Sequence, residues 1–330
     1  MNRILRTAAA AVVLSSFAAG PALAATVMRV SHQLPPRHHM AKLIEVWAAD
    51  VERLSNGAID VQVFPANQAF KPRENFPAVA RGKIEAALSV NFQWGTTIPE
   101  MNITLMPYTF TDIGLMKKFP GSPVAKFLEA KLLAKGVRNI GWFFVTNTSI
   151  FTSKDKPLIR PEDFKGVKIR GLNKLVDSGL IALGAAPSAM SGSKVYQALQ
   201  TGVIDAGLTD VSAAYSRKYY EVQKYGTVSK MFSVFFHLYV NPAWWDGLDQ
   251  AARDAITKAS AKAELLAIST TEETAAKAPD QLRGKGMKIY EHNAAEEAAF
   301  RDIMVGPFTK AFLDASGADG QKILDLVGAL

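Results

Sequence analysis

Apolar residues recur along this chain with two alternating periods, one typical of strands and one typical of helices. Residues 27–32 and 59–64 alternate apolar with polar positions, which predicts two strands. Between them, residues 38–54 place apolar side chains every three or four positions, which predicts an amphipathic helix. Strand, helix and strand at this spacing form a βαβ unit. The rhythm continues through a strand at 85–90, a helix at 124–135 and a strand at 137–145, so we expect an α/β fold with mostly parallel sheets.

The middle of the chain repeats the rhythm in a more compact form. Residues 167–170 predict a short strand that Gly171 ends, and residues 172–183 and 193–201 predict helices before a strand at 203–208. This order places Arg170 at the carboxyl end of a strand, where open α/β sheets bind their ligands. A guanidinium group is planar, charged and forked, and therefore suits a carboxylate. The alternative is a surface or salt-bridging arginine.

The last third of the chain predicts long helices. Residues 249–278 contain neither Gly nor Pro and stop at Pro279. Such a helix would be about 45 Å long, too long for one small lobe. We therefore expect it to lie across two lobes. A further helix at 294–313 should turn three apolar residues inward, namely Phe300, Ile303 and Met304.

The first residues have the pattern of a secretory signal peptide. Arg3 and Arg6 are followed by the apolar residues 8–19 and by Ala22-Leu23-Ala24, a typical cleavage site. We therefore expect residues 1–24 to be removed and the mature protein to be exported to a bacterial periplasm. The remaining length suits two lobes. We assign residues 25–147 and about 233–270 to lobe I, and residues 148–232 and about 271–330 to lobe II, with a hinge at 147–152.

Composition and charge narrow the function. The chain has 330 residues, 48% of them hydrophobic, no cysteine, and a net charge of +8. The absence of cysteine excludes disulfides and thiolate chemistry. The basic residues are scattered, and the densest group, Arg283, Lys285 and Lys288, has no interleaved aromatic residues. This argues against nucleic acid as a partner, whereas a mild positive potential suits a collector of organic anions.

Catalytic and metal-binding patterns are weak. The chain lacks the motifs of serine hydrolases, zinc proteases and nucleotide-binding loops. Glu272-Glu273 and Glu296-Glu297 are adjacent pairs that do not share a helix face, so we interpret them as solvated charges. His38 and His39 at a helix start have no third ligand nearby for a metal. The sequence therefore predicts no catalytic residue, no metal and no cofactor.

Polar and aromatic residues gather at the expected strand ends instead. Ligand pockets combine apolar walls with a few placed polar groups. For the aromatic residues, core packing is the competing interpretation, and for the histidine a structural role. The candidate ligand-binding residues are His32, Asn91, Gln93, Trp94, Asn147, Ser149, Arg170, Thr209, Asp210 and Phe232.

Four segments resemble a known family: KIR with Arg170, LGAAP (183–187), VYQALQTGVIDA (195–206) and KYYEVQKY (218–225). Together they are similar to the solute-binding proteins of tripartite ATP-independent periplasmic (TRAP) transporters, the dicarboxylate-binding-protein family, over most of the mature chain. The resemblance implies a two-lobe periplasmic binding protein, each lobe a mixed, mostly parallel sheet flanked by helices. It also implies that the protein is not an enzyme and delivers an organic acid to a two-component membrane permease driven by an ion gradient. We expect a monomer.

The resemblance also assigns residue roles. Arg170 matches the arginine that holds the ligand carboxylate. Thr209 stands where the family usually has asparagine, Ser149 where many members have a second arginine, and Gly192 where many have a bulky aromatic residue. These departures favour a hydroxylated monocarboxylate, such as a sugar acid or uronate with hydroxyls on Asp210, or an aromatic acid. A C4-dicarboxylate is the alternative ligand, and a periplasmic enzyme, a metal-binding protein or a sensor subunit are the alternative classes.

Overall fold

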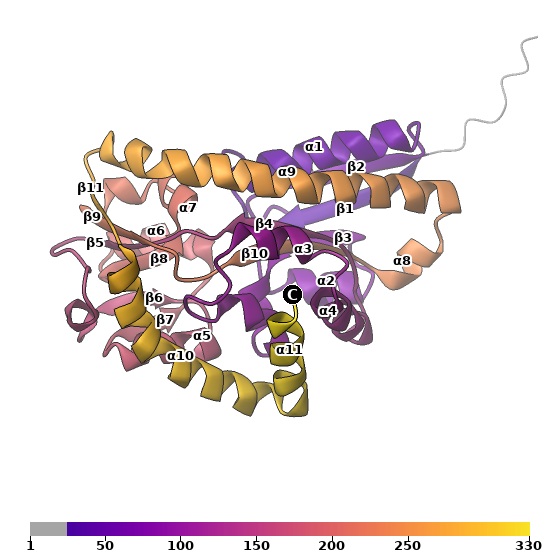
Figure 1. Cartoon of the computed structure of the whole chain (residues 1–330). Coiled ribbons are helices and arrows are strands. Elements are labelled where there is room, and N and C mark those ends of the chain that lie inside the picture. The colour runs from indigo at the N-terminus through magenta and orange to yellow at the C-terminus, as the bar shows by residue number, and fades with distance from the viewer. Residues whose placement is uncertain (1–24) are drawn as a thin grey trace, which may run out of the picture.

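The computed structural model describes residues 25–330, and the expected signal segment 1–24 lies outside the described residues. Two mixed β-sheets, each covered by helices, stand side by side beneath one long helix (Figure 1). The predicted α/β class is therefore confirmed. No helix within the described residues has the length and apolar character needed to cross a bilayer.

The first sheet has five strands in the order β2-β1-β3-β10-β4. β1 (Thr26–His32) pairs in parallel with β2 (Ile59–Phe64) and β3 (Ala86–Val90). β10 (Val234–Val240) lies antiparallel between β3 and β4 (Arg138–Thr146). The carboxyl ends of β1 and β3 therefore lie at one edge, together with the amino end of β10.

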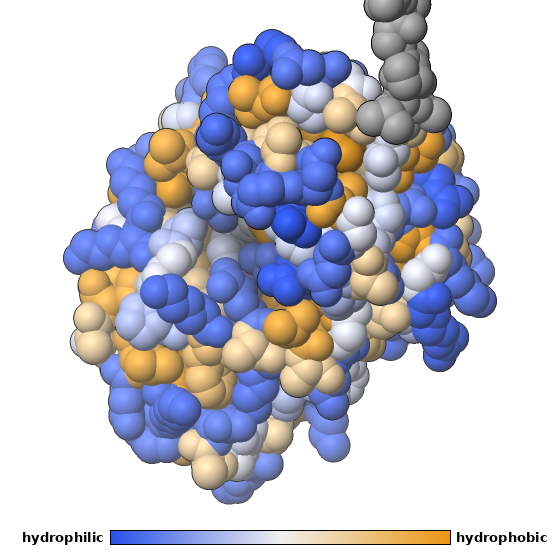
Figure 2. Space-filling view, turned by 90° about the vertical axis from the view of Figure 1, so that its right-hand side faces the viewer, coloured by the Kyte–Doolittle hydropathy of each residue, from blue (hydrophilic) through white to orange (hydrophobic). Residues whose placement is uncertain are grey.

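Helices cover the first sheet because their apolar faces match it. In the first of them, Met40, Leu43, Ile44, Trp47 and Val51 are all buried, as the helical period predicted. Figure 2 shows an outer face of this lobe with hydrophilic residues covering most of it and small hydrophobic areas between them. The helices of this lobe are α1 (His39–Leu54), α2 (Asn75–Ala80), α3 (Ile113–Lys118), α4 (Pro123–Ala134), α8 (Pro242–Asp246) and the 3-10 helices η1 (Asn91–Trp94) and η2 (Pro99–Leu105).

The second sheet has six strands in the order β11-β9-β5-β8-β6-β7. β6 is parallel to both β7 and β8, whereas β5 is antiparallel to β8 and β9. The parallel strands bring three carboxyl ends to one edge, where Arg170 lies. The strands are β5 (Ser149–Ser153), β6 (Lys168–Gly171), β7 (Ala186–Ala189), β8 (Ala206–Asp210), β9 (Tyr225–Ser229) and β11 (Lys288–Glu291).

One helix that covers the second sheet, α10 (Ala294–Ser316), differs in part from the sequence prediction. In α10, Phe300 and Met304 are buried as predicted, but Ile303 is 36% exposed. The reason is that α10 packs on α5 through residues four apart, so Ile303 lies beside the buried row. α11 (Ala318–Gly328) then contacts α4 of the first lobe. The other helices are η3 (Pro161–Phe164), α5 (Lys174–Ala182), α6 (Gly192–Gln200), α7 (Val211–Ser216), η4 (Tyr219–Glu221) and α10 (Ala294–Ser316).

α9 (Gln250–Arg283) runs over both sheets, as its length predicted (Figure 1). It contacts β4 and α1 in the first lobe and α7 and β11 in the second. The prediction that it ends at Pro279 is wrong, since it continues for another turn. Pro279 leaves one carbonyl without its helical donor. Ala278, Pro279 and Leu282 are all buried, so packing on the second lobe holds the last turn in place.

Two short segments also join the lobes, residues 147–148 after β4 and 230–233 after β9. The hinge at 147–152 stays a prediction, and the segment between the two sheets is shorter than that range, because Ser149 already pairs with Asp210 and Ser229 in the second sheet. Backbone hydrogen bonds from Tyr108 N to Met231 O and from Ser233 N to Thr104 O fix the second segment to the first lobe. The full division of the chain into two lobes stays a prediction.

Candidate functional site

Arg170 lies at the carboxyl end of β6 with its side chain buried. Its Nη1 donates to the carbonyl of Leu208 at 2.7 Å, and its Nε and Nη2 donate to the carbonyl of Met190 at 3.3 and 3.4 Å. A guanidinium group has five N–H donors, two on each terminal nitrogen. One N–H on Nη1 and one on Nη2 are therefore left, the pair that a carboxylate accepts in a bidentate contact.

The charge of Arg170 has no acidic partner. No ion pair between side chains of residues 25–330 includes it. Burial lowers the pKa of Arg170 to about 10. The nearby Asp177 carboxylate accepts from Leu172 N instead, and burial raises its own pKa to about 6. A buried cation without a counter-ion is costly, and a bound anion would offset that cost.

The first lobe closes over Arg170. The ring of Phe92 in η1 lies 5.7 Å from the guanidinium carbon, within the range of a cation–π contact. Asn173, the N-cap of α5, donates from Nδ2 to Phe92 O and to Asn102 Oδ1, both at 2.8 Å. Arg170 is therefore enclosed between the lobes, at a place where residues from both make direct contact.

The other candidates of the second lobe hydrogen-bond close by. Thr209 Oγ1 accepts from Arg217 Nη1 at 3.1 Å. Asp210 caps α7: its carboxylate accepts from Ala213 N at 2.7 Å and from the Ser212 hydroxyl. The hydroxyl of Ser149 donates to Ser229 O at 2.8 Å. Asp210 and Ser149 are thus engaged by their own neighbours, while Thr209 orients an arginine.

In the first lobe, four candidates lie at the ends of β1 and β3 and are incompletely hydrogen-bonded. His32, Asn91 and Trp94 are buried, and Gln93 is half-buried. His32 Nδ1 accepts from Leu34 N, and burial lowers the pKa of His32 to about 4, so it is neutral. The Trp94 ring packs on Phe76 and Tyr239 in an aromatic cluster. Each of these four candidates has one buried polar atom with no partner within the described part of the chain, a costly condition in a folded protein: His32 Nε2, Asn91 Oδ1, Gln93 Oε1 and Trp94 Nε1.

Two cavities adjoin this region. The larger, about 520 Å³, lies between the lobes and is lined from both sides. A smaller one of about 170 Å³ is lined by Phe92, Gln93, Trp94 and Asn173 among others. Gln93 Nε2 donates to Gln33 Oε1 at 3.2 Å, which links the walls of the two cavities. The larger cavity is lined by Gln33, Pro35, Arg37, Ala66, Asn67, Gly192, Ser193, Tyr196, Arg217, Lys218 and Glu221.

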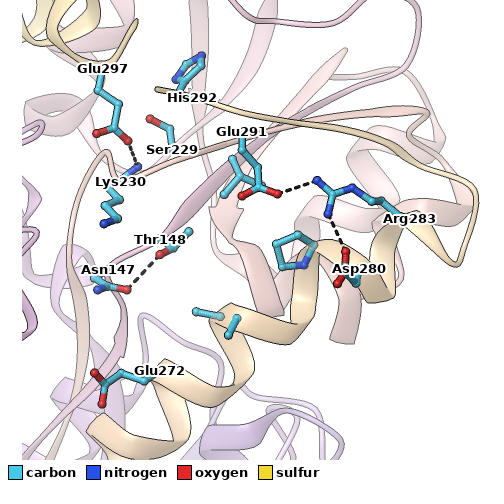
Figure 3. Close-up of a pocket in the computed structure, with 14 residues that line it drawn as sticks. Asn147, Thr148, Ser229, Lys230, Glu272, Asp280, Arg283, Glu291, His292 and Glu297 are labelled. Atoms are coloured by element: carbon cyan, nitrogen blue, oxygen red, sulfur yellow. Dashed lines mark hydrogen bonds and ion pairs between the residues drawn. The ribbon is translucent and has the colours of Figure 1, made fainter. Parts of the chain in front are cut away.

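Asn147 and Phe232 lie elsewhere. Asn147 lines a separate cavity of about 420 Å³ on the α9 side of the hinge, where its Oδ1 accepts from Thr148 (Figure 3). Charged residues from α9, β11 and α10 form much of that cavity's wall. Phe232, in the segment that follows β9, is 1% exposed and belongs to the main apolar core. None of the ten candidates lines the cavity that contains Arg217, and only Gln93 and Trp94 line the smaller cavity beside it. Arg170 lies buried next to these cavities without lining either of them.

Sequence reasoning missed Phe92, Asn173, Met190 and Arg217. Asn173 precedes an expected helix, a pattern that indicates an N-cap but not a contact to the other lobe. Arg217 directly precedes the KYYEVQKY segment and had no feature that separated it from the other scattered cations. Met190 acts through its backbone carbonyl, which side-chain patterns do not reveal.

Comparisons with known proteins agree with this architecture. Residues 30–313 match the family model of bacterial extracellular solute-binding proteins, family 7. The C4-dicarboxylate-binding periplasmic protein DctP of Rhodobacter capsulatus is 32% identical over 321 residues, 96% of each chain. A TRAP periplasmic solute-binding protein from Desulfovibrio salexigens, with bound orotic acid, superposes with a TM-score of 0.86 at 25% identity, covering 92% of this chain and 97% of that one.

A second solved structure gives the same result. The TRAP periplasmic solute-binding protein of Sulfurospirillum deleyianum, with bound succinate, has a TM-score of 0.83 at 25% identity and covers 92% of this chain and 100% of its own. The resemblance found in the sequence and the two-lobe fold that it implied are both confirmed. The matched proteins bind solutes and are not enzymes. The chain belongs to family 7 of the bacterial extracellular solute-binding proteins.

Proposed function

We propose that this protein captures a small organic acid between its lobes, with Arg170 on the acid group, and delivers it to the membrane permease of a TRAP transporter. The observation that carries the proposal is the buried Arg170 guanidinium, which has no carboxylate partner and keeps one free N–H on each terminal nitrogen. Burial strengthens an ion contact because the surrounding dielectric is low. Closure of two lobes around such a contact excludes water from it.

The relatives support an acid as the ligand class. The Rhodobacter capsulatus relative is named for C4-dicarboxylates, and the two solved relatives contain orotic acid and succinate. All of these are acids of modest size, although they differ in shape and in the number of acid groups. The permease partner and the periplasmic location come to this chain from the same relatives. The signal-peptide pattern of residues 1–24 supports export.

Two kinds of acid are candidates for the ligand. Ser149 and Gly192 favoured a hydroxylated monocarboxylate or an aromatic acid, because one arginine is missing and a bulky side chain is absent. Asp210 is a helix cap here, which weakens its expected contact with ligand hydroxyls. The space over Gly192 is filled by Arg217, which weakens the case for a bulky ligand. Both observations support the C4-dicarboxylate alternative.

A thermal-shift panel tests the proposal. The mature protein is heated with succinate, a uronate, an aromatic acid and a neutral sugar, each at the same concentration. A ligand present at 100 times its Kd stabilises the folded protein by about 2.7 kcal/mol. We expect at least one acid to raise the unfolding temperature while the neutral sugar leaves it unchanged. If no acid does so, and mass spectrometry of the native protein finds no acid that co-purifies, the proposal is wrong.

A further inference from the structure

Arg217 fills the space that a side chain at position 192 would need. A β-carbon on Gly192 would lie 2.7 Å from Cζ, Nη1 and Nη2 of Arg217, well inside van der Waals contact. Arg217 follows the last turn of α7, and Gly192 is the first residue of α6. The guanidinium group thus rests on the backbone at the start of α6, in a position that only a glycine leaves open.

Like Arg170, the Arg217 guanidinium has no carboxylate partner among the described residues. Its guanidinium donates to Thr209 Oγ1, and no side-chain ion pair found in residues 25–330 includes it. The cavity that it lines contains one carboxylate, Glu221, which is engaged by Lys218 at 3.2 Å and by the Tyr196 hydroxyl at 2.7 Å. Most of the N–H groups of Arg217 are therefore available to a ligand in the cavity.

The two arginines are held by successive residues of one strand. Arg170 donates to the carbonyl of Leu208, and Arg217 donates to the hydroxyl of Thr209, the next residue of β8. Successive strand residues are about 3.3 Å apart along the strand. Burial is the main cause of the lowered pKa of Arg170 and of His38, and the charge of Arg217 lowers both pKa values further. Two cations that act on each other in this way repel, and an anion that touches both would offset the repulsion.

We propose that Arg217 is a second anion-binding residue of the interlobe site, and that the ligand on Arg170 carries a second acid group at the end that faces Gly192. The proposal rests on the proposed function, since it concerns the far end of the same ligand. Ser149 does not supply the second cation, because its short side chain is neutral and hydrogen-bonded to Ser229. Arg217 supplies it from another element, and Gly192 provides the space.

Matched pairs of ligands test this role. Succinate, glutarate and adipate are each compared with their monoamides, which have the same length but one carboxylate fewer. Calorimetry gives Kd for wild type and for Arg217→Gln. We expect wild type to prefer at least one diacid over its monoamide. A hydrogen-bonded charge contact is worth about 1.5–3 kcal/mol, so Arg217→Gln should weaken that diacid by about 10- to 140-fold and leave the monoamide unchanged.

A second variant, at Gly192, disturbs the same contact between Arg217 and the start of α6. Gly192→Leu would push the guanidinium off α6, because the new side chain needs the volume that Arg217 occupies. We expect the same selective loss of diacid affinity. Arg283→Gln, which removes an arginine from the cavity on the α9 side, is the control and should change neither Kd. Thermal unfolding of each variant without ligand shows that it is folded.

The outcomes separate this inference from the proposed function. If Arg217→Gln weakens diacid and monoamide equally, or weakens neither, Arg217 does not hold a second acid group and the inference is wrong. In that case binding of any acid through Arg170 still supports the proposed function. If wild type binds neither diacids nor monoamides nor any other acid, both proposals are wrong.

Discussion

The interlobe cavity and the cavity on the α9 side of the hinge are both rich in charged residues, but their charges are arranged differently. On the α9 side, Arg283 contacts Asp280 at 2.7 Å and Glu291 at 2.6 Å, and the carboxylate of Glu297 accepts from the backbone of Lys230 (Figure 3). In the interlobe site, Arg170 and Arg217 contact carbonyl and hydroxyl oxygens only.

Arg170 and Arg283 also differ in burial, and this makes the difference in charge pairing important for function. Arg170 is 2% exposed, whereas the side chain of Arg283 is 42% exposed. Exposed ion pairs contribute little to stability, since water already solvates both partners. A buried cation without a counter-ion destabilises the folded protein until an anion binds. Under the proposed function, the unpaired buried charge marks the binding site, and a charged cavity alone does not.

Removing Arg170 should have the largest effect. Loss of one partner from a buried charge contact costs about 2–5 kcal/mol, so Arg170→Gln should weaken the best acid found in the panel by about 30- to 4,000-fold. Calorimetric Kd values measure this. Without ligand, the free energy of unfolding should change little, because the variant loses hydrogen bonds to Met190 and Leu208 but also loses an unpaired buried charge. Urea unfolding measures that part.

Two results would contradict this prediction for Arg170. A variant that binds acids as tightly as wild type would remove Arg170 from the site. A variant that is strongly destabilised without ligand would show that the guanidinium is a structural element of the lobe contact with Phe92. Either result would mean that an unpaired charge does not mark the ligand position in this protein.

His32, which is buried at the carboxyl end of β1, should make stability depend on pH. Burial lowers the pKa of His32 from 6.5 to about 4. Between these values the unfolded chain binds a proton that the folded protein does not, so the free energy of unfolding falls as pH falls, by up to about 3 kcal/mol. Urea unfolding from pH 7 to 4 measures this, and in His32→Asn that part of the slope should disappear.

Other buried groups act over the same range, so the difference between the two proteins is the test. Burial lowers the pKa of His237 to about 3, which adds to the effect of His32. Burial raises the pKa of Asp177 to about 6 and that of Glu264 to about 7, and these groups stabilise the fold as pH falls. Equal pH slopes for wild type and His32→Asn would contradict the burial of His32.

Much of the fold follows from local patterns in the sequence. The βαβ unit with α1, the strand that ends at Arg170 and the long helix α9 were predictable because each has a strong apolar period or a sharp end signal. The stop at Pro279 failed because tertiary packing of Ala278 and Leu282 outweighed a local helix-breaking signal. Packing of this kind leaves no trace in a short window of sequence.

The site was harder to predict because its residues meet only after folding. Arg170 could be found from its place at a strand end. The contact of Arg217 with Gly192 could not, because these two residues lie 25 positions apart in the chain, at the ends of two different helices. The sequence suggested empty space at Gly192, and the structure fills that space from another element. Asp210 had a suitable side chain in the expected place, yet its carboxylate faces its own helix. The direction in which the side chains of Arg217 and Asp210 point cannot be deduced from residue type.

Removing Arg283 should have the smallest effect, and it tests whether the cavity on the α9 side takes part in binding. Arg283→Gln breaks two ion pairs, to Asp280 and Glu291. Since such exposed pairs are worth about 0–1 kcal/mol each, the free energy of unfolding should fall by no more than about 1–2 kcal/mol. The acid Kd should match wild type, because Arg283 is paired with two carboxylates and lines a different cavity from Arg217. Urea unfolding and calorimetry measure both quantities. A loss of acid affinity comparable to that of Arg170→Gln would show that the paired cavity takes part in binding, and charge pairing would then no longer distinguish the two cavities.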